Sequence, residues 1–565
     1  MKSISRVVLW SVVVSGFGVG CVADPVEEQT VDAADVSAKK STVFLDQGWS
    51  ATTRASFYQT TQGSRMLPYA WFLHLEQATN CEPFREAENM RRMGFLVDGA
   101  SSENPDGLPV GFAKDDDAVK GASLGLTCAT CHTGEIKYRG TKIRIDGGQA
   151  FADLEQLQDG LLASLSATLA DAAKFDRFAK RVLGNGASAA QKADLRTKMV
   201  PVRDWWSARV TRSRGLTPHG PSRIDAFTVI GNEVTCALLN IPGNCAPAVA
   251  PTQYPYLWGT PDYDWVQYNS SVHSPIGRNV GEVTGVFAEA TLSPQGTVVS
   301  SANLPNLERL ENWLKTLQPP AWPEDLLGAI DHTLADRGEA IYETSCASCH
   351  PSVAPRTAPN AFGMTFGMTD HSTPLLPFGG AGTLGTDPTA AMTFATRRSD
   401  PGPWRPIFAA MVPSPIGPDG KVPAFALLSV SGSMILKTFF AVNAFTPAQQ
   451  IAFLGYREGL TPTQAQLTTY KARPLDGIAF TAPYLHNGSV PSLYEMLLPP
   501  AQRTKQFYVG SRTFDPKHIG FSTDKEPESV LLDTTQLGNS NSGHTYGTDL
   551  TKADRMALLE YLKSI

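Results

Sequence analysis

Two five-residue stretches decide the interpretation of this sequence: Cys128-Ala129-Thr130-Cys131-His132 and Cys346-Ala347-Ser348-Cys349-His350. Both have the pattern C-x-x-C-H, in which two thiols three residues apart can each add to one vinyl group of a single porphyrin. The histidine that follows is then held beneath the iron as its proximal ligand. One accidental match in a chain of this composition has odds of roughly one in 500, so two accidental matches are very improbable.

Other sites that are built from cysteine fit the spacing less well. A redox-active C-x-x-C pair does not need an adjacent histidine, and a zinc site would place its two cysteine pairs about 15–20 residues apart. Here the two pairs begin at positions 128 and 346. We therefore predict two covalently bound haem c groups, with porphyrins held by Cys128, Cys131, Cys346 and Cys349 and irons bound by His132 and His350.

The N-terminus indicates export. Lys2 and Arg6 precede an uncharged, largely apolar stretch from Val7 to Gly20, which is too short to span a membrane and is typical of a secretory signal. Ordinary cleavage before Asp24 and a lipoprotein signal with a lipid anchor at Cys21 both remain open. We expect the protein to be periplasmic, an outer-membrane lipoprotein or secreted. No later segment looks apolar enough to span a membrane.

Composition and charge narrow the functional classes. Apolar residues make up 42% of the 565 residues, which is enough for a sizeable core, and the 48 Gly and 41 Pro indicate many loops. Lys and Arg number 48 against 54 Asp and Glu, a net charge of −6. Nucleic-acid and anionic-membrane surfaces need clustered positive charge, so we expect no nucleic-acid partner.

The leucine pattern predicts the domain organisation. Leucines recur at three- and four-residue spacing in 154–169 and 304–317, which predicts two amphipathic helices. The proline cluster at 319–323 then marks a boundary, and a last helix opens at Thr551 with Asp554 in a capping position. We predict a mainly α fold of two cytochrome c-like haem domains with long loop-rich extensions. Its parts are a signal (1–23), a flexible tether (24–44), an N-terminal haem domain (45–320) and a C-terminal haem domain (324–565).

Four longer stretches carry a family resemblance. KARPLDGIAFTAPYLHNGSVPSL (471–493) resembles the signature downstream of the second haem in bacterial di-haem cytochrome c peroxidases. CATCHTGEIKYRGTKIRIDGG (128–148), DWVQYNSSVHSPIGRNVGEVTGVF (264–287) and FYVGSRTFDPKHIGF (507–521) are most similar to the rubber-oxygenase branch of that superfamily. The resemblance covers about residues 45–565 and implies a haem-dependent oxidoreductase.

The resemblance also implies different roles for the two haems. In the superfamily the N-terminal haem is reactive, so His132 belongs to the catalytic site, and the haem of His350 is six-coordinate and transfers electrons. We choose His518 as the sixth ligand of the second haem, with His486 as runner-up. Four methionines are further alternatives: Met364, Met368, Met411 and Met434. The reactive haem would use O2 or H2O2, with an apolar polyisoprenoid as substrate or a cytochrome as electron donor.

Several assignments remain open. Cys236 and Cys245 fit either a short disulfide or two buried thiols, and Cys81 has no evident partner. Calcium occurs between the haems of such peroxidases, but we find no acidic loop that requires it. Candidates for the distal side of the first haem are His74, His219, His273, Tyr254 and Phe287, and candidates for an electron relay are Trp205, Trp206, Trp258 and Trp265. An alternative function is a di-haem electron-transfer cytochrome without its own substrate, although this chain is longer than two such haems require.

Overall fold

The structure is a computed structural model and describes residues 42–263, 265–350, 375–377, 384–455 and 467–565. The predicted signal 1–23, Cys21, nearly all of the predicted tether, Met364 and Met368 lie outside these residues. The longer helices are α1 (Ala51–Gln59), α4 (Leu154–Ala170), α5 (Ala172–Leu183), α6 (Ala189–Ser213), α8 (Pro275–Gly285), α9 (Leu304–Leu314), α11 (His332–Ser345), α12 (Thr389–Thr396), α14 (Ala424–Val442), α15 (Pro447–Leu454) and α17 (Lys552–Ser564).

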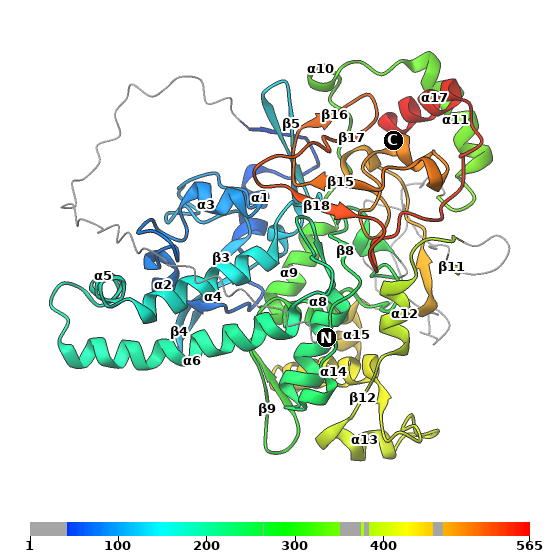
Figure 1. Cartoon of the computed structure of the whole chain (residues 1–565). Coiled ribbons are helices and arrows are strands. Elements are labelled where there is room, and N and C mark those ends of the chain that lie inside the picture. The colour runs from blue at the N-terminus through cyan, green and yellow to red at the C-terminus, as the bar shows by residue number, and fades with distance from the viewer. Residues whose placement is uncertain (1–41, 264, 351–374, 378–383, 456–466) are drawn as a thin grey trace, which may run out of the picture. The chain divides into compact units, whose positions relative to one another are not determined.

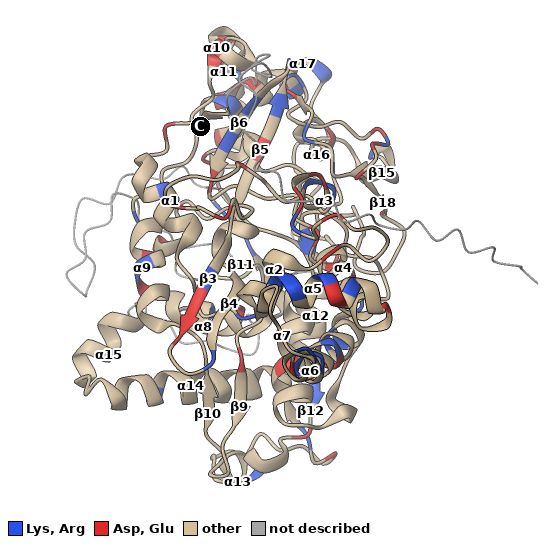
Figure 2. Cartoon of the chain, turned by 90° about the vertical axis from the view of Figure 1, so that its left-hand side faces the viewer, with Lys and Arg blue, Asp and Glu red and all other residues tan. Residues whose placement is uncertain are grey.

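The helices predicted from the leucine pattern are confirmed. In α4, Leu157, Leu161 and Leu165 are buried along one face, and Asp153 caps the first turn by accepting from the backbone N–H of Gln156. In α17, Thr551 caps the helix in the same way by accepting from the N–H of Asp554. Acidic and basic residues are interspersed along the helices and strands of the cartoon in Figure 2.

The mainly α prediction is wrong. The structure is 43% helical and 15% strand, so the fold is mixed α/β with many small sheets. One three-stranded sheet contains β1 (Val43–Phe44), β5 (Thr133–Tyr138) and β6 (Thr141–Asp146), and another contains β2 (Leu67–Pro68), β3 (Phe112–Asp117) and β4 (Gly121–Leu126). The remaining pairs include β7 (Arg223–Ile224) with β8 (Thr252–Gln253), β9 (Ala290–Leu292) with β10 (Val298–Ser300), β11 (Leu375–Pro377) with β14 (Thr469–Lys471), β12 (Arg398–Ser399) with β13 (Val422–Pro423), β15 (Gln506–Val509) with β18 (Val530–Asp533), and β16 (Phe514–Asp515) with β17 (Gly520–Phe521).

The β5–β6 hairpin has a sequence pattern that is typical of two strands joined by a tight turn. Tyr138 pairs with Thr141, so the connection contains only Arg139 and Gly140. Both residues have positive φ, at 47° and 79°, as a tight two-residue hairpin turn requires. The alternation of polar and apolar residues on either side of this turn predicts strands, although the leucine pattern dominated our interpretation.

The second motif is carried by two helices in close contact. α11 and α17 lie side by side (Figure 1), and α11 ends at Ser345, directly before Cys346. Gly338 allows this approach, because a Cβ atom at that position would lie 2.1 Å from the carbonyl oxygen of Ala557 in α17. The crossing therefore fixes the end of α11 from which the second C-x-x-C-H turn leaves.

One hydrophobic cluster contains residues from both predicted haem domains, including Ile143, Leu307, Tyr342 and Leu559. A second cluster lies within residues 66–287. The boundary at 319–323 stays a prediction. α14 is long and apolar enough to cross a membrane by composition, contrary to our expectation, and in the structure it packs against α8 and the short helix at 232–238.

Candidate functional site: two cavities behind the C-x-x-C-H motifs

The first motif forms a tight turn between two hairpins. Cys128–Thr130 is a single 3-10 turn that follows β4, and the Thr127 hydroxyl accepts from the N–H of Ala129. The N–H of His132 donates to the carbonyl of Cys128 over 3.0 Å. This turn brings the two thiols and the imidazole to the wall of a cavity with about 1320 Å³ of empty space, counted to its open mouth.

His132 is held in place as a neutral imidazole. Its Nδ1 lies 2.7 Å from the carbonyl oxygen of Pro255, and because a carbonyl can only accept, Nδ1 is the donor. Nε2 therefore keeps its lone pair, as a metal-binding imidazole needs. Burial lowers the pKa of His132 to about 4, so the ring stays uncharged at neutral pH.

The two thiols do not resemble a redox-active pair. Cys128 and Cys131 form no disulfide, and burial raises the pKa of each to about 12. Reactive dithiols instead have depressed pKa values, because the thiolate is the nucleophile. Buried, protonated thiols beside a fixed imidazole fit covalent attachment of a porphyrin.

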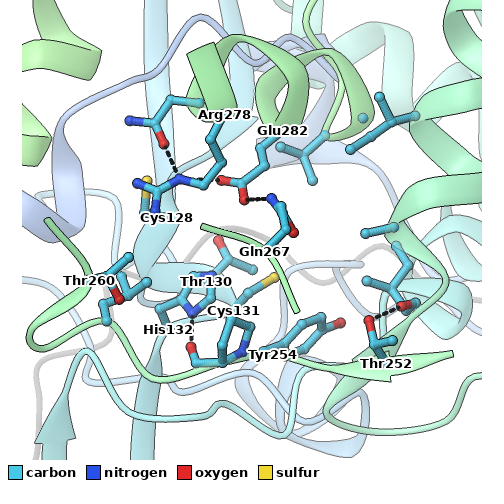
Figure 3. A pocket seen from close by; sticks show the side chains of 18 of the residues that line it. Cys128, Thr130, Cys131, His132, Thr252, Tyr254, Thr260, Gln267, Arg278 and Glu282 are labelled. Carbon is cyan, nitrogen blue, oxygen red and sulfur yellow. Dashed lines mark hydrogen bonds and ion pairs between the residues drawn. The ribbon is translucent and has the colours of Figure 1, made fainter. Parts of the chain in front are cut away.

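A polar group faces the same cavity from the other side. Figure 3 shows Arg278, Glu282 and Gln267 on one side of Cys131, and His132 with Tyr254 on the other. α8 supplies Arg278 and Glu282, which are one helical turn apart, and Gln267 Nε2 donates to Glu282 Oε1 over 2.8 Å. Protein encloses the Glu282 carboxyl although it faces the cavity, and this burial raises its pKa.

The rest of the first cavity is largely apolar. Its lining includes Leu154, Ile224, Ala226, Val229, Ile230, Leu310 and Leu314. Among the described lining residues, His132 is the one histidine, and there is no methionine. The arrangement therefore offers a proximal imidazole on one side and an acid–amide pair on the other.

The second motif leaves the end of α11. The N–H of Cys346 donates to the carbonyl of Tyr342 over 2.8 Å, and the Tyr342 hydroxyl donates to the carbonyl of His350. His350 Nδ1 lies 2.5 Å from the carbonyl oxygen of Arg473 and therefore donates to it. The adjoining cavity has about 820 Å³ of empty space and is lined by Cys346, Cys349, His350, Tyr470, His486 and His544, among others.

His544 faces His350 across this second cavity. The centres of the two rings are 6.3 Å apart. Two imidazoles that share one metal ion would be separated by roughly 6.3 Å, because each metal–nitrogen bond is about 2.05 Å and each nitrogen lies about 1.1 Å from its ring centre. His544 Nδ1 is buried and has no hydrogen-bond partner among the described residues. These observations fit a metal ion between the two rings, as in a six-coordinate haem.

The two sixth ligands predicted from the sequence lie in different places: His518 is outside both cavities, and His486 lines the second one. His518 lies in the turn between β16 and β17, is 42% exposed, and contacts Asp515 through Nδ1 over 2.7 Å. It is not among the described lining residues of either cavity. His486 lines the second cavity, but its ring stacks on Tyr470 with centres 4.2 Å apart. We missed His544 because it stands alone in a glycine- and serine-rich loop.

Most other candidates lie away from the cavities. Of the proposed distal residues, Tyr254 lines the first cavity, on the His132 side, while His74, His219, His273 and Phe287 are not among its described lining residues. Met411 is 41% exposed and Met434 packs against the core. No group of three or more His, Cys, Asp or Glu side chains within the described ranges could hold a metal ion without a porphyrin.

Of the two alternatives left open for Cys236 and Cys245, the structure contains the disulfide. Cys236 and Cys245 are bonded, and Cys81 is disulfide-bonded as well, although we found no evident partner for it in the sequence.

Residues 469–508 match the family described as RoxA-like, cytochrome c-like. Such a region implies binding of haem c, but the match includes neither C-x-x-C-H motif and does not determine the number of haems. The resemblance to rubber oxygenases is thus confirmed for the cytochrome c-like region only.

Two proteins of Sinorhizobium fredii (strain NBRC 101917 / NGR234) are similar over longer stretches. The uncharacterized protein y4iJ is 32% identical over 589 aligned positions, which cover 95% of each chain. The uncharacterized protein y4iM is 24% identical over 307 positions, which cover 53% of this chain and 58% of y4iM.

Proposed function

Because the chain belongs to the same family as the uncharacterized protein y4iJ and contains a RoxA-like, cytochrome c-like region, we propose that it is a haem-dependent oxidoreductase with two covalently bound haem c groups. One observation carries the proposal: the two cavities differ in what faces the proximal histidine. Cys128, Cys131 and His132 would hold one haem, and Cys346, Cys349 and His350 the other.

The second cavity is suited to electron transfer. His544, whose ring centre lies 6.3 Å from that of His350, could supply a second imidazole to a haem held there, and an iron with two protein ligands would have no free position for a substrate. The Arg473 carbonyl fixes His350 through Nδ1, and the close helix crossing at Gly338 fixes the turn that carries Cys346. A site with so little freedom to rearrange favours rapid electron transfer.

The first cavity is suited to activating H2O2 or O2. A haem bound there would supply an iron with an open position for either oxidant. Its proximal side is fixed by the contact between His132 and the Pro255 carbonyl. On the opposite side, Gln267 donates to Oε1 of Glu282 and orients the carboxyl, whose Oε2 lies 3.8 Å from Arg278 Nε. In its carboxylate form, this group could accept a proton from one oxygen of H2O2 and then donate the same proton to the other.

The acid–amide pair favours peroxidase activity with H2O2, and we propose an external cytochrome as electron donor. The apolar lining of the first cavity supports a second candidate, oxygenation of an apolar substrate such as a polyisoprenoid. We also propose that the protein acts outside the cytoplasm, because haem is attached covalently there, with a lipid anchor at Cys21 as one alternative.

Ligand titration of single-haem variants tests the proposal. Cyanide should bind the haem in the Cys346→Ala/Cys349→Ala variant, which keeps the His132 site, and should leave the Cys128→Ala/Cys131→Ala variant unchanged. H2O2-dependent oxidation of a reduced cytochrome should be lost in His132→Ala. Cyanide binding only at the His350 haem would contradict the assignment of roles. Binding at neither haem would favour the electron-transfer cytochrome.

A further inference from the structure

Arg473 lies in the wall between the two cavities. Together with Tyr268 and Lys471 it lines both of them. It comes just after β14 and before Pro474, and a residue that precedes proline is restricted to extended backbone conformations. The direction of the Arg473 carbonyl is therefore fixed locally, and this carbonyl accepts from His350 Nδ1.

The side chain of Arg473 contacts the segment that holds the other histidine, His132. Arg473 Nη2 donates to the carbonyl of Tyr256 over 2.8 Å, and its guanidinium carbon lies 3.4 Å from the centre of the Tyr256 ring. Tyr256 directly follows Pro255, whose carbonyl accepts from His132 Nδ1. The Tyr256 hydroxyl in turn donates to the carbonyl of Pro474 over 2.6 Å. Two short segments, 255–256 and 473–474, are thus joined by contacts in both directions.

We propose that Arg473 is a positioning residue shared by both haem sites, which holds His350 through its carbonyl and His132 through its side chain. The inference rests on the proposed two-haem function. A partner that accepts a hydrogen bond from a metal-bound histidine sets the orientation and basicity of the imidazole. At the His132 site, this partner is the Pro255 carbonyl. Arg473 acts on it indirectly, because its charge and its hydrogen bond hold the Pro255–Tyr256 segment in place.

The two contacts have a consequence that separates Arg473 from an ordinary structural residue. Any substitution at 473 keeps a backbone carbonyl and therefore keeps the acceptor for His350. The side chain, in contrast, supports His132. Changing the side chain should consequently disturb the His132 haem more than the His350 haem, although residue 473 touches the ligand of the latter directly.

The test compares Arg473→Gln with the unaltered protein, after the number of covalent haems in each has been measured. We expect both haems to remain, the iron–histidine stretching frequency of the reduced His132 haem to shift, and the midpoint potential of that haem to fall. The potential should fall because loss of a nearby positive charge favours the oxidised iron. Arg473→Lys keeps a charge and should recover part of the potential without restoring the stretching frequency.

Arg512→Gln is the matched control. Arg512 is another enclosed arginine of the C-terminal half, and its Nη2 donates to the carbonyl of Gly94 over 2.7 Å, but it does not line either cavity among the described residues. It should leave both haem spectra unchanged. If Arg473→Gln does not fold, Tyr256→Phe, which removes the hydroxyl contacts to Pro474 and Tyr263 but keeps the ring, should shift the same frequency by a smaller amount.

Unchanged spectra of the His132 haem in the folded 473 and 256 variants would overturn the inference, and so would a shift confined to the His350 haem. Fewer than two covalent haems in the unaltered protein would instead contradict the proposed function itself.

Discussion

Replacing His544 by alanine should change the spin state of one haem only. The ring of His544 is 6.3 Å from that of His350, the separation expected for two imidazoles on one iron. Burial, followed by the nearby His350 and Arg503, lowers the pKa of His544 to about 3. The ring is therefore neutral at all working pH values and can offer a lone pair to the iron.

The size of the effect follows from the number of sites. If the chain carries the two proposed haems and His544 binds one of them, His544→Ala should change half of the total haem from low to high spin. The first haem should keep its spectrum, because His544 does not line the first cavity. Electron paramagnetic resonance and optical spectra of the oxidised protein measure both fractions. His544→Met should keep the haem six-coordinate and raise its potential.

His518→Ala and His486→Ala are the controls. The His518 ring is partly exposed and contacts Asp515, and the His486 ring stacks on Tyr470, so neither change should alter the high-spin fraction. An unchanged spin state in His544→Ala would refute the reasoning, and so would a loss of the low-spin signal in His518→Ala.

Three further changes test other parts of the molecule. Glu282→Gln should reduce peroxide-dependent turnover by about 10²–10⁴-fold without loss of haem. The wild-type rate should rise as pH rises through the raised pKa of Glu282, because only the carboxylate can accept the first proton, and an unaltered rate and pH profile in the variant would exclude this role. Gly338→Ala should destabilise the fold by about 1–3 kcal/mol in chemical denaturation, because the new Cβ would clash with the Ala557 carbonyl. Gly243→Ala is the control, because no atom lies within 4 Å of the Cβ that it adds. Equal denaturation midpoints for the two variants would argue against a tight crossing of α11 and α17. Cys236→Ser/Cys245→Ser removes the disulfide and should lower the free energy of unfolding by about 2–4 kcal/mol. Chemical denaturation measures this as well, and an unchanged free energy of unfolding would mean that the disulfide does not constrain the unfolded chain.

The parts of the site that depend on local sequence could be predicted. The C-x-x-C-H spacing places Cys128, Cys131 and His132 at one cavity wall, because side chains within a turn of five residues can point in few different directions. The same holds for the second motif. The leucine spacing likewise predicts α4, whose buried face is continuous over several turns.

The parts that depend on distant contacts could not be predicted in this way. His544 faces His350 only because a loop near the C-terminus folds back. In this loop the backbone N–H of His544 donates to the carbonyl of Leu384. Arg473 reaches Tyr256 across 217 positions of sequence. The short strands were missed because β5 and β6 are each six residues long and depend on the Arg139-Gly140 turn for their pairing.

The central claim is that both C-x-x-C-H motifs carry a covalently bound haem. Mass spectrometry of the denatured protein, purified from a host that matures c-type cytochromes, measures this directly. We predict a chain that retains two haems after acid–organic extraction, and one haem in each of the variants Cys128→Ala/Cys131→Ala and Cys346→Ala/Cys349→Ala. A chain with a single haem, or with haem that the solvent removes, would contradict the account.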